Sequence, residues 1–359
     1  MRHINYLLAA VLIVLPGCLT EVDPDLKNDF HSFTPSEIND SWELSDPFTE
    51  GMNAEQLEEI YRSVHSDENL WQIRSLLVVR NGKLIAESYM KDEADRMHPR
   101  AIWSCTKQVM SILVGIAIDK GLIESLDDTI GMYLPEVKNY PDKKNITIYN
   151  LLTMQSGIGF NNDEHTDILR GKKTSNSLDW ILSLPLIFEQ GSAFNYNDGD
   201  PHIVSAIIQK VTGKPADEWA DEVLFSKLQI KNYQWYRYID GITFGGFGIL
   251  FTPRELARVA QCVLNNGSFE NETVISSGWI QEMVSQKASY ENWGFGLYWW
   301  IDVERNIFFM NGHGGQYAFV LPDKNMVVVI TSEPNTQDNF QLGMERGLQI
   351  ADRIIEVCD

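Results

Sequence analysis

The chain has 359 residues, which is enough for one large domain or two smaller ones with a substantial core. Hydrophobic residues make up 44% of it, and the 10 Trp, 13 Tyr and 16 Phe predict that most of the chain is globular. The formal net charge of −21 argues against binding to nucleic acid or to an anionic membrane surface through charge, because both need clusters of Lys and Arg.

The N-terminus has the pattern of an export signal. A basic start is followed by an apolar run from Tyr6 to Leu15, which is too short to span a bilayer. The run ends in Leu15-Pro16-Gly17-Cys18, which resembles a bacterial lipobox. We therefore expect residues 1–17 to be a signal peptide and Cys18 to carry lipid. This predicts an exported lipoprotein, anchored to a membrane and facing the periplasm or the outside. The alternative is an ordinary signal peptide whose cysteine is incidental.

After the signal peptide we expect a tether, followed by a single domain over residues 51–359. Residues 18–50 are acidic and polar with little periodicity, which predicts the tether. Ala54 to Val64 has the pattern of an amphipathic helix. Residues 73–89 show the pattern of a β-hairpin, in which Asn81-Gly82 forms a two-residue type I′ turn.

The middle of the chain, about residues 104–285, is predicted to be a mainly helical lobe. A strongly apolar helix follows Ser104 and ends at Lys120-Gly121, where glycine suits a helix C-terminus. A second helix runs from His202 to Thr212, and Thr252-Pro253-Arg254-Glu255 is a capping box that begins a third. The acidic stretch from Asp163 to Asp167 is interpreted as a solvated loop.

Strand patterns return after Gly294. The expected strands are Gly296–Asp302, Asn306–Met310, Tyr317–Leu321 and Met326–Thr331, and a helix from Gly343 to Val357 closes the chain. Because strands lie at both ends of the domain, residues 73–90 and 294–332 are expected to share one central antiparallel sheet flanked by helices. The helical lobe is then inserted between them. The predicted fold class is α+β.

The cysteines predict neither a disulfide framework nor a metal site. After Cys18 the chain contains Cys105, Cys262 and Cys358, and an odd number gives no framework. Whether Cys262 and Cys358 pair is left open. No pair has metal-ligand spacing, and neither a metal nor an organic cofactor is predicted.

The strongest candidate for chemistry is Ser104 with Lys107. Residues three apart on a helix lie one turn apart on the same face, which places the ammonium group beside the hydroxyl. If burial removes water from Lys107, its pKa falls and it can accept the proton of the serine. Ser88 and Lys91 repeat the spacing, but Ser88 lies in a predicted strand, where these positions point to opposite faces. Only the first pair predicts an activated nucleophile.

Three further segments accompany this pair. Tyr196-Asn197-Asp198 lies in a polar loop that contains glycine. His313-Gly314-Gly315, followed by Gln316, lies just before a predicted strand, and its glycines allow a ligand to approach the backbone closely. The run from Leu151 to Gly157 ends in a turn.

Together these segments resemble the serine β-lactamase and penicillin-binding-protein superfamily. Within it they are similar to the class C β-lactamase-like esterases, DD-peptidases and 6-aminohexanoate-dimer hydrolases. Trp103 to Lys107 matches the nucleophile motif, Tyr196-Asn197-Asp198 the Y-x-N motif, and His313-Gly314-Gly315 the K-T-G motif. Leu151 to Gly157 matches the "LLTMTSG" segment. The resemblance covers about residue 51 to the C-terminus and implies a β-lactamase/transpeptidase-like fold.

The resemblance implies a role for each motif residue. Ser104 is the acylated nucleophile, and Lys107 holds or accepts its proton. Tyr196 relays protons between Ser104 and the leaving group. The backbone N–H groups of Ser104 and Gln316 form the oxyanion hole. The residues expected to contact substrate are Asp198, His313, Gly314 and Gly315.

Two positions depart from the family pattern. Asp198 stands where the motif has an asparagine, and an ionised carboxylate accepts hydrogen bonds but donates none. His313 stands where the motif has a lysine, and histidine is a weaker anchor for a substrate carboxylate. Both changes argue against true β-lactamase activity.

The predicted function is a serine hydrolase that cleaves an ester or amide through an acyl-enzyme on Ser104. Its partner is a small-molecule ester, amide or peptide substrate. It does not bind nucleic acid, and it meets a membrane only through the lipid anchor. Two alternatives remain open: a penicillin-binding or sensor-type module that is acylated without turnover, and a true DD-peptidase or β-lactamase.

Overall fold

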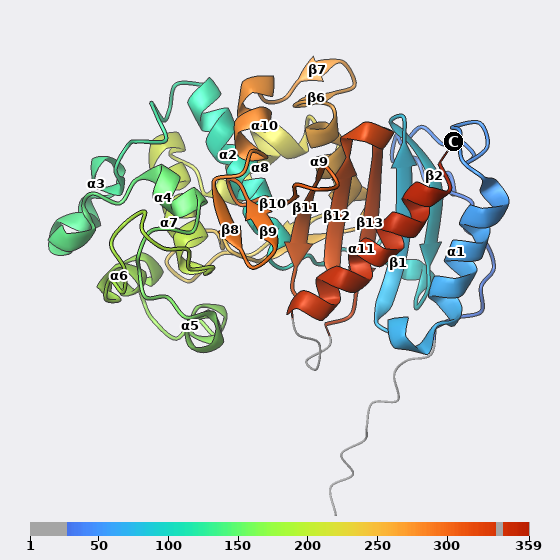
Figure 1. Cartoon of the computed structure of the whole chain (residues 1–359). Helices are drawn as coiled ribbons and strands as arrows, with labels where there is room; N and C mark the ends of the chain where they lie inside the picture. The colour runs from blue at the N-terminus through green and yellow to red at the C-terminus, as the bar shows by residue number, and fades with distance from the viewer. Residues whose placement is uncertain (1–26, 335–339, 359) are drawn as a thin grey trace, which may run out of the picture.

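The computed structural model describes residues 27–334 and 340–358 of the chain. Its largest element is an eight-stranded antiparallel sheet in the order β2-β1-β13-β12-β11-β10-β9-β8 (Figure 1). The strands are β1 Ile73–Arg80, β2 Lys83–Tyr89, β8 Ala288–Tyr290, β9 Trp293–Phe295, β10 Trp300–Asp302, β11 Ile307–Gly312, β12 Gln316–Leu321 and β13 Met326–Ser332. The N-terminal hairpin joins the C-terminal strands through β1, where Val78 lies opposite Val328. The prediction of one sheet built from both ends of the domain is confirmed.

The hairpin of β1 and β2 forms as the Asn-Gly pair predicts. Asn81 and Gly82 both have positive φ angles, 54° and 79°, as a type I′ turn requires. Asparagine and glycine are the residues that adopt this conformation at least cost. The turn sets the register in which Leu77 faces Glu87.

Helices cover both faces of the sheet. Figure 1 shows α1 (Ala54–Ser66) and α11 (Phe340–Glu356) in front of it. Behind it, α9 (Pro253–Leu264) packs against β1, β12 and β13. The predicted capping box begins α9, because Thr252 accepts from the backbone of Glu255 and the Glu255 side chain accepts from the backbone of Thr252.

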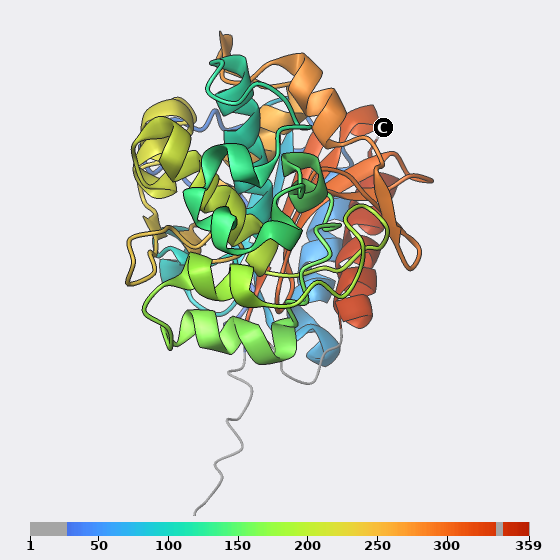
Figure 2. The ribbon, with the colours of Figure 1, turned by 90° about the vertical axis from the view of Figure 1, so that its left-hand side faces the viewer.

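The predicted helical lobe lies beside the sheet in Figure 1, and it faces the viewer in front of the sheet in Figure 2. Its helices are α2 Cys105–Asp119, α3 Ile130–Tyr133, α4 Ile148–Leu152, α5 Asn162–Arg170, α6 Ser177–Ser183, α7 Gly199–Thr212, α8 Ala216–Ala220, α9 and α10 Ser277–Met283. The lobe also carries the short strands β3 Arg100–Ala101, β4 Gln234–Trp235, β5 Ile249–Phe251, β6 Ser268–Phe269 and β7 Glu272–Thr273. Helix α2 is buried along nearly its whole length and contacts both α7 and β11. Its N-terminus therefore lies where the lobe meets the sheet.

The tether prediction for residues 18–50 is wrong for the part that the structure describes. Residues 27–50 lie along β2, where the Leu84 N–H donates to Glu43 and the Ser45 N–H donates to Leu84. Trp42 is buried, and the guanidinium of Arg258 lies 4.9 Å from its ring centroid. Three of its carboxylates pair with cations of the domain: Asp40 with Arg254 at 2.9 Å, and Glu43 and Glu50 with Lys83.

Two local predictions also need correction. The expected strand Gly296–Asp302 is interrupted by a turn, in which Tyr298 has a φ of 65° and its backbone bonds to Leu152 and Gln108 of the lobe. The acidic stretch from Asp163 to Asp167 is part of helix α5. Asn161 caps this helix, and acidic residues in a first turn interact favourably with the helix dipole.

The predicted signal peptide and the lipid site at Cys18 lie outside the described residues. No helix in the described ranges is both long and apolar enough to cross a membrane. Cys105 and Cys262 are buried free thiols, so the possible disulfide between Cys262 and Cys358 is not formed.

Candidate active site

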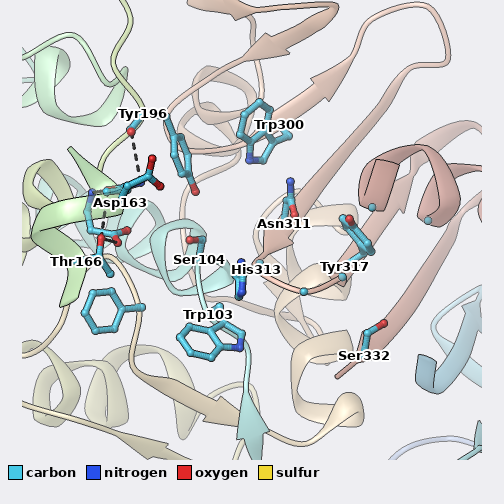
Figure 3. A pocket seen from close by; sticks show the side chains of 18 of the residues that line it. Trp103, Ser104, Asp163, Thr166, Tyr196, Trp300, Asn311, His313, Tyr317 and Ser332 are labelled. Atoms are coloured by element: carbon cyan, nitrogen blue, oxygen red, sulfur yellow. Dashed lines mark hydrogen bonds between the residues drawn. The ribbon is translucent and has the colours of Figure 1, made fainter. Parts of the chain in front are cut away.

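A cavity of about 820 Å³ opens where the helical lobe meets the sheet. Ser104 lies at its centre, just before α2, with His313 of the β11–β12 turn beside it (Figure 3). Tyr196, from the loop before α7, and Trp300 of β10 form one side. The structure thus brings the three separate motif segments to one place.

The nucleophile candidate follows a residue in an unusual backbone conformation. Trp103 has a φ of 50°, which bulky residues rarely adopt. The Cys105 N–H donates to the Ile102 carbonyl at 3.1 Å, which closes a tight turn around this point. The turn leaves Ser104 partly exposed to the cavity while α2 behind it is buried. Backbone strain of this kind is common where a side chain must be held for function.

Lys107 is fully buried, and its ammonium group has three acceptors. The Nζ atom lies 2.9 Å from Ser104 Oγ, 2.6 Å from Asp198 Oδ1 and 2.8 Å from the Gly246 carbonyl. A protonated lysine has three N–H bonds to donate, so this geometry satisfies each of them. The arrangement is that of a charged lysine holding the serine oxygen.

The expectation that burial lowers the pKa of Lys107 is therefore wrong. Burial acts in that direction, but the charge of Asp198 and the neighbouring Tyr196 outweigh it and raise the pKa above the ordinary value. The reason is that a carboxylate in direct contact favours the charged form of the amine. Lys107 is therefore an ammonium ion in contact with the Ser104 oxygen.

Tyr196 lies over this ion. Its ring centroid is 4.9 Å from Lys107 Nζ, and its phenol interacts with both Ser104 and Lys107. Burial raises the pKa of Tyr196 by more than the ammonium lowers it, so the phenol keeps its proton at neutral pH. Trp300 supports the ring from the other side at a centroid distance of 5.6 Å. A neutral phenol placed this way can receive one proton while it gives up another.

Asp198 lines the cavity, as expected of a residue near the substrate, but its carboxylate is already held by other side chains. Its Oδ1 accepts from Lys107, and its Oδ2 accepts from the Thr166 hydroxyl at 2.6 Å. The residue is 6% exposed, so the protein already uses both of its oxygens. Gly246 packs directly against it, and a Cβ there would lie 2.9 Å from Asp198 Oδ1. The carboxylate is a fixed counter-ion for Lys107.

The β11–β12 turn borders the cavity opposite the lobe. His313 is exposed in it, with its ring 5.5 Å from that of Trp103, and Gly314 and Gly315 have φ angles of 77° and 90°. These angles favour glycine. All three residues line the cavity, as expected of substrate-binding residues.

The same turn lies against the backbone that precedes the nucleophile. At Gly312 a Cβ would lie 2.2 Å from the Ile102 carbonyl, so only glycine allows this approach. The Cys105 Sγ donates to the Gln316 carbonyl at 3.4 Å. The Gln316 side chain is anchored on Ser332. The turn that leads to Gln316 thus lies against the backbone on either side of Ser104, although Gln316 itself is buried and does not line the cavity.

Sequence reasoning missed three residues of the site. Trp300 of β10, to which no role was given, lines the cavity beside Tyr196. Thr166 lies in the stretch expected to be a loop and Asn162 directly precedes that stretch, but both are on α5 and face the Tyr196–Asp198 segment. Asn162 and Thr166 are four residues apart, which places them on one face of a helix, and this spacing could have indicated that they act together.

The comparisons with known proteins agree with this geometry. A model of the beta-lactamase family matches residues 74–348. The chain belongs to the β-lactamase family. Over 304 residues it is 24% identical to the 6-aminohexanoate-dimer hydrolase of Paenarthrobacter ureafaciens, and the match covers 76% of each chain.

Solved structures of the β-lactamase fold are similar across most of the chain. A putative 6-aminohexanoate-dimer hydrolase from Bacillus anthracis has a TM-score of 0.72 at 20% identity, covering 93% of this chain and 92% of that one. EstCE1, a hydrolase with promiscuous acyltransferase activity, has a TM-score of 0.67 at 15% identity, covering 84% of this chain and 98% of that one. The predicted family and fold are confirmed.

The second Ser-x-x-Lys copy lies outside the site of this β-lactamase-family chain. Ser88 is in strand β2, and Lys91 Nζ pairs with Glu333 at 2.6 Å. Neither residue lines the cavity. Throughout residues 27–334 and 340–358, no cluster of three or more His, Cys, Asp or Glu side chains is arranged to hold a metal ion.

Proposed function

We propose that this protein is a serine hydrolase that cleaves a small ester or a linear amide through an acyl-enzyme on Ser104. The observation that carries the proposal is the contact between Ser104 Oγ and the buried Lys107 ammonium at the centre of the cavity. A surface lysine in an ordinary helix is solvated and does not have this set of acceptors. Tyr196 beside both groups supplies the route for a proton.

In the acylation step Ser104 Oγ forms a bond to the substrate carbonyl carbon, and the bond from that carbon to the leaving oxygen or nitrogen breaks. Tyr196 donates its phenolic proton to the leaving atom while it receives the proton of Ser104. The phenol is unchanged at the end, and no separate base is consumed. The Lys107 ammonium stabilises the negative charge that develops on Ser104 and Tyr196.

Deacylation uses the same groups in reverse. A water molecule attacks the acyl carbon, its proton passes through Tyr196 to Ser104 Oγ, and the acid is released. The carbonyl oxygen is stabilised in both steps by backbone N–H groups of Ser104 and Gln316. Gly312 supports this part of the proposal because it lets the turn before Gln316 approach the Ile102 carbonyl, two residues before Ser104.

The charges around Ser104 favour small esters and linear amides over β-lactams. Asp198 is committed to Lys107 and Thr166 and offers no donor to an acylamino group. His313 gives a substrate carboxylate a weaker anchor than the lysine of the family motif. A charge-assisted hydrogen bond contributes about 1.5–3 kcal/mol, so each loss costs roughly ten- to a hundredfold in selectivity. A small ester needs only the nucleophile and the oxyanion hole.

The test combines labelling with turnover. A fluorophosphonate probe should label the wild type and the Ser88→Ala variant but not Ser104→Ala; the two serines form a matched pair because each begins a Ser-x-x-Lys sequence. Labelling retained in Ser104→Ala contradicts the mechanism. The wild type should also hydrolyse nitrophenyl butyrate with a higher kcat/KM than nitrocefin, and His313→Lys should narrow the difference. A single burst without steady turnover on any ester or amide would favour the sensor alternative.

A further inference from the structure

Helix α5 contacts the catalytic segment through two polar side chains on one face. The Thr166 hydroxyl donates to Asp198 Oδ2 at 2.6 Å. The Asn162 side chain accepts from the Asp198 N–H at 2.9 Å and donates to the Tyr196 carbonyl at 3.4 Å. Figure 3 shows Thr166 on the cavity wall opposite Asn311 and Tyr317. One turn of α5 therefore touches both residues that surround Lys107.

We propose that Thr166 and Asn162 are positioning residues, which orient the Asp198 carboxylate and the Tyr196 backbone so that Lys107 is held against Ser104. The proposal rests on the function proposed above, because it assigns the two residues to the same reaction. It makes α5 part of the catalytic apparatus, although neither side chain is expected to touch the reacting atoms.

The geometry of Asp198 shows why an external donor is needed. Asp198 is the N-cap residue of α7, but its side chain makes no capping hydrogen bond there. Its orientation is set instead by two donors on opposite sides, Lys107 at Oδ1 and Thr166 at Oδ2. Gly246 blocks a third side, since even a Cβ at that position would be only 2.9 Å from Oδ1. Without Thr166 the carboxylate keeps one donor and can rotate away from Lys107.

The Asn162 contacts fix the backbone that carries both groups. Its side-chain oxygen accepts from Asp198, and its side-chain nitrogen donates two residues earlier to Tyr196. The Thr166 hydroxyl also lies 3.4 Å from the Asn162 side-chain oxygen, so the two residues form one polar unit. Because this unit spans the segment, it sets the position of the phenol relative to the carboxylate.

A test of the proposal can use the pH dependence of the labelling rate of Ser104, which depends on the titratable groups around Lys107. Asp198 and Tyr196 raise its pKa, and the further titratable neighbours include Cys105 on α2, His202 on α7 and Tyr298 of the turn between β9 and β10. Burial raises the pKa of Cys105 and of Tyr298 and lowers that of His202 to about 4, so these three groups stay neutral at neutral and alkaline pH. The alkaline limb of the rate profile lies above the ordinary pKa of lysine in the wild type, and a change in it reports on Lys107 and Tyr196.

The test compares Thr166→Val, which keeps the shape but lacks the hydroxyl, with Thr166→Ser, which restores it. The measurement is the second-order rate constant of fluorophosphonate labelling as a function of pH. In Thr166→Val the rate should fall about tenfold, as expected for loss of a hydrogen bond to a charged group. The alkaline limb should move to lower pH by about one unit, because a loosened carboxylate raises the pKa of Lys107 less. Thr166→Ser should return both values toward wild type.

Thr212→Val is the matched control. Thr212 lies at the far end of α7, where its hydroxyl donates to the Ile208 carbonyl at 2.7 Å and also bonds to the Lys214 backbone, so the variant also loses hydroxyl hydrogen bonds, but away from the cavity. It should leave both the rate and the pH profile unchanged. If Thr166→Val and Thr212→Val have the same profile as the wild type, the inference is wrong.

A double-mutant cycle tests whether Thr166 acts through Asp198. In an Asp198→Asn background, adding Thr166→Val should cause little further change in the labelling rate, because the carboxylate it orients is gone. A full tenfold loss in that background contradicts the inference. Absence of labelling in the wild type would instead contradict the proposed function, so the two failures are distinguishable.

Discussion

Replacement of Asp198 by asparagine tests the charge state of Lys107 most directly. The two side chains are 2.6 Å apart, and both are buried. Removing one partner of a buried ion pair costs about 3–5 kcal/mol, because the remaining charge is left without compensation. We expect Asp198→Asn to lose about 3 kcal/mol of the free energy of unfolding near neutral pH.

The loss should depend on pH in a defined direction. In the wild type the pKa of Lys107 is raised, so the stabilisation is present below the ordinary lysine pKa and fades only as the pH rises through the raised value. In the variant the effect of burial dominates and the pKa of Lys107 falls below its ordinary value. The variant then loses stability as the pH falls through that range, since the folded state must bury an unpaired ammonium ion. The difference between the two proteins should therefore be largest near pH 7 and smaller near pH 10, where the lysine of the variant has lost its proton but the wild-type ion pair still contributes.

Urea denaturation followed by tryptophan fluorescence measures this difference, since the chain contains 10 Trp. Asp163→Asn is the matched control, because Asp163 is an exposed carboxylate on the cavity rim, and its loss changes the net charge equally. An equal loss of stability at both pH values would refute the reasoning. So would an unchanged stability near pH 7, which would mean that Lys107 is neutral in the folded protein.

Two further predictions concern the oxyanion hole and the anchor. Gly312→Ala should lower kcat by about tenfold or more, because its Cβ would lie 2.2 Å from the Ile102 carbonyl and push the Gln316 backbone away from Ser104. Gly278→Ala, where a Cβ meets nothing within 4 Å, is the control and should retain full activity; equal kcat in both variants would remove the argument for this contact. Cys18→Ser should block processing of the exported protein, whereas the wild type should begin at Cys18 and partition into detergent. A soluble mature protein with a different first residue would rule out the lipid anchor.

The sequence alone determined the features that depend on neighbouring residues. The Asn81-Gly82 turn, the capping box at Thr252 and the glycine that follows Lys120 were predictable because each uses hydrogen bonds or φ angles within a few positions. The Ser104–Lys107 contact belongs to the same class, since helix geometry places residues three apart together. The order of the motifs then gave the family and its fold.

Predictions from local sequence patterns were wrong where a segment is held by residues far away in the chain. Residues 27–50 look like a tether by composition, but their acidic groups are satisfied by cations such as Arg254, more than two hundred positions later. The turn at Tyr298 interrupts an apparently continuous strand because Leu152 and Gln108 bind its backbone. Neither contact leaves a signal in the segment itself.

The tertiary structure alone decided the charge of Lys107. Helix spacing and burial, read from the sequence, predicted a neutral amine ready to accept a proton. Folding places Asp198, 91 positions away, in contact with Lys107, and places Thr166 behind Asp198. Electrostatic interactions depend on distance in space and not on separation along the chain. Contact with Asp198 therefore keeps Lys107 charged, so that it donates a hydrogen bond to Ser104 and does not accept the proton of the serine.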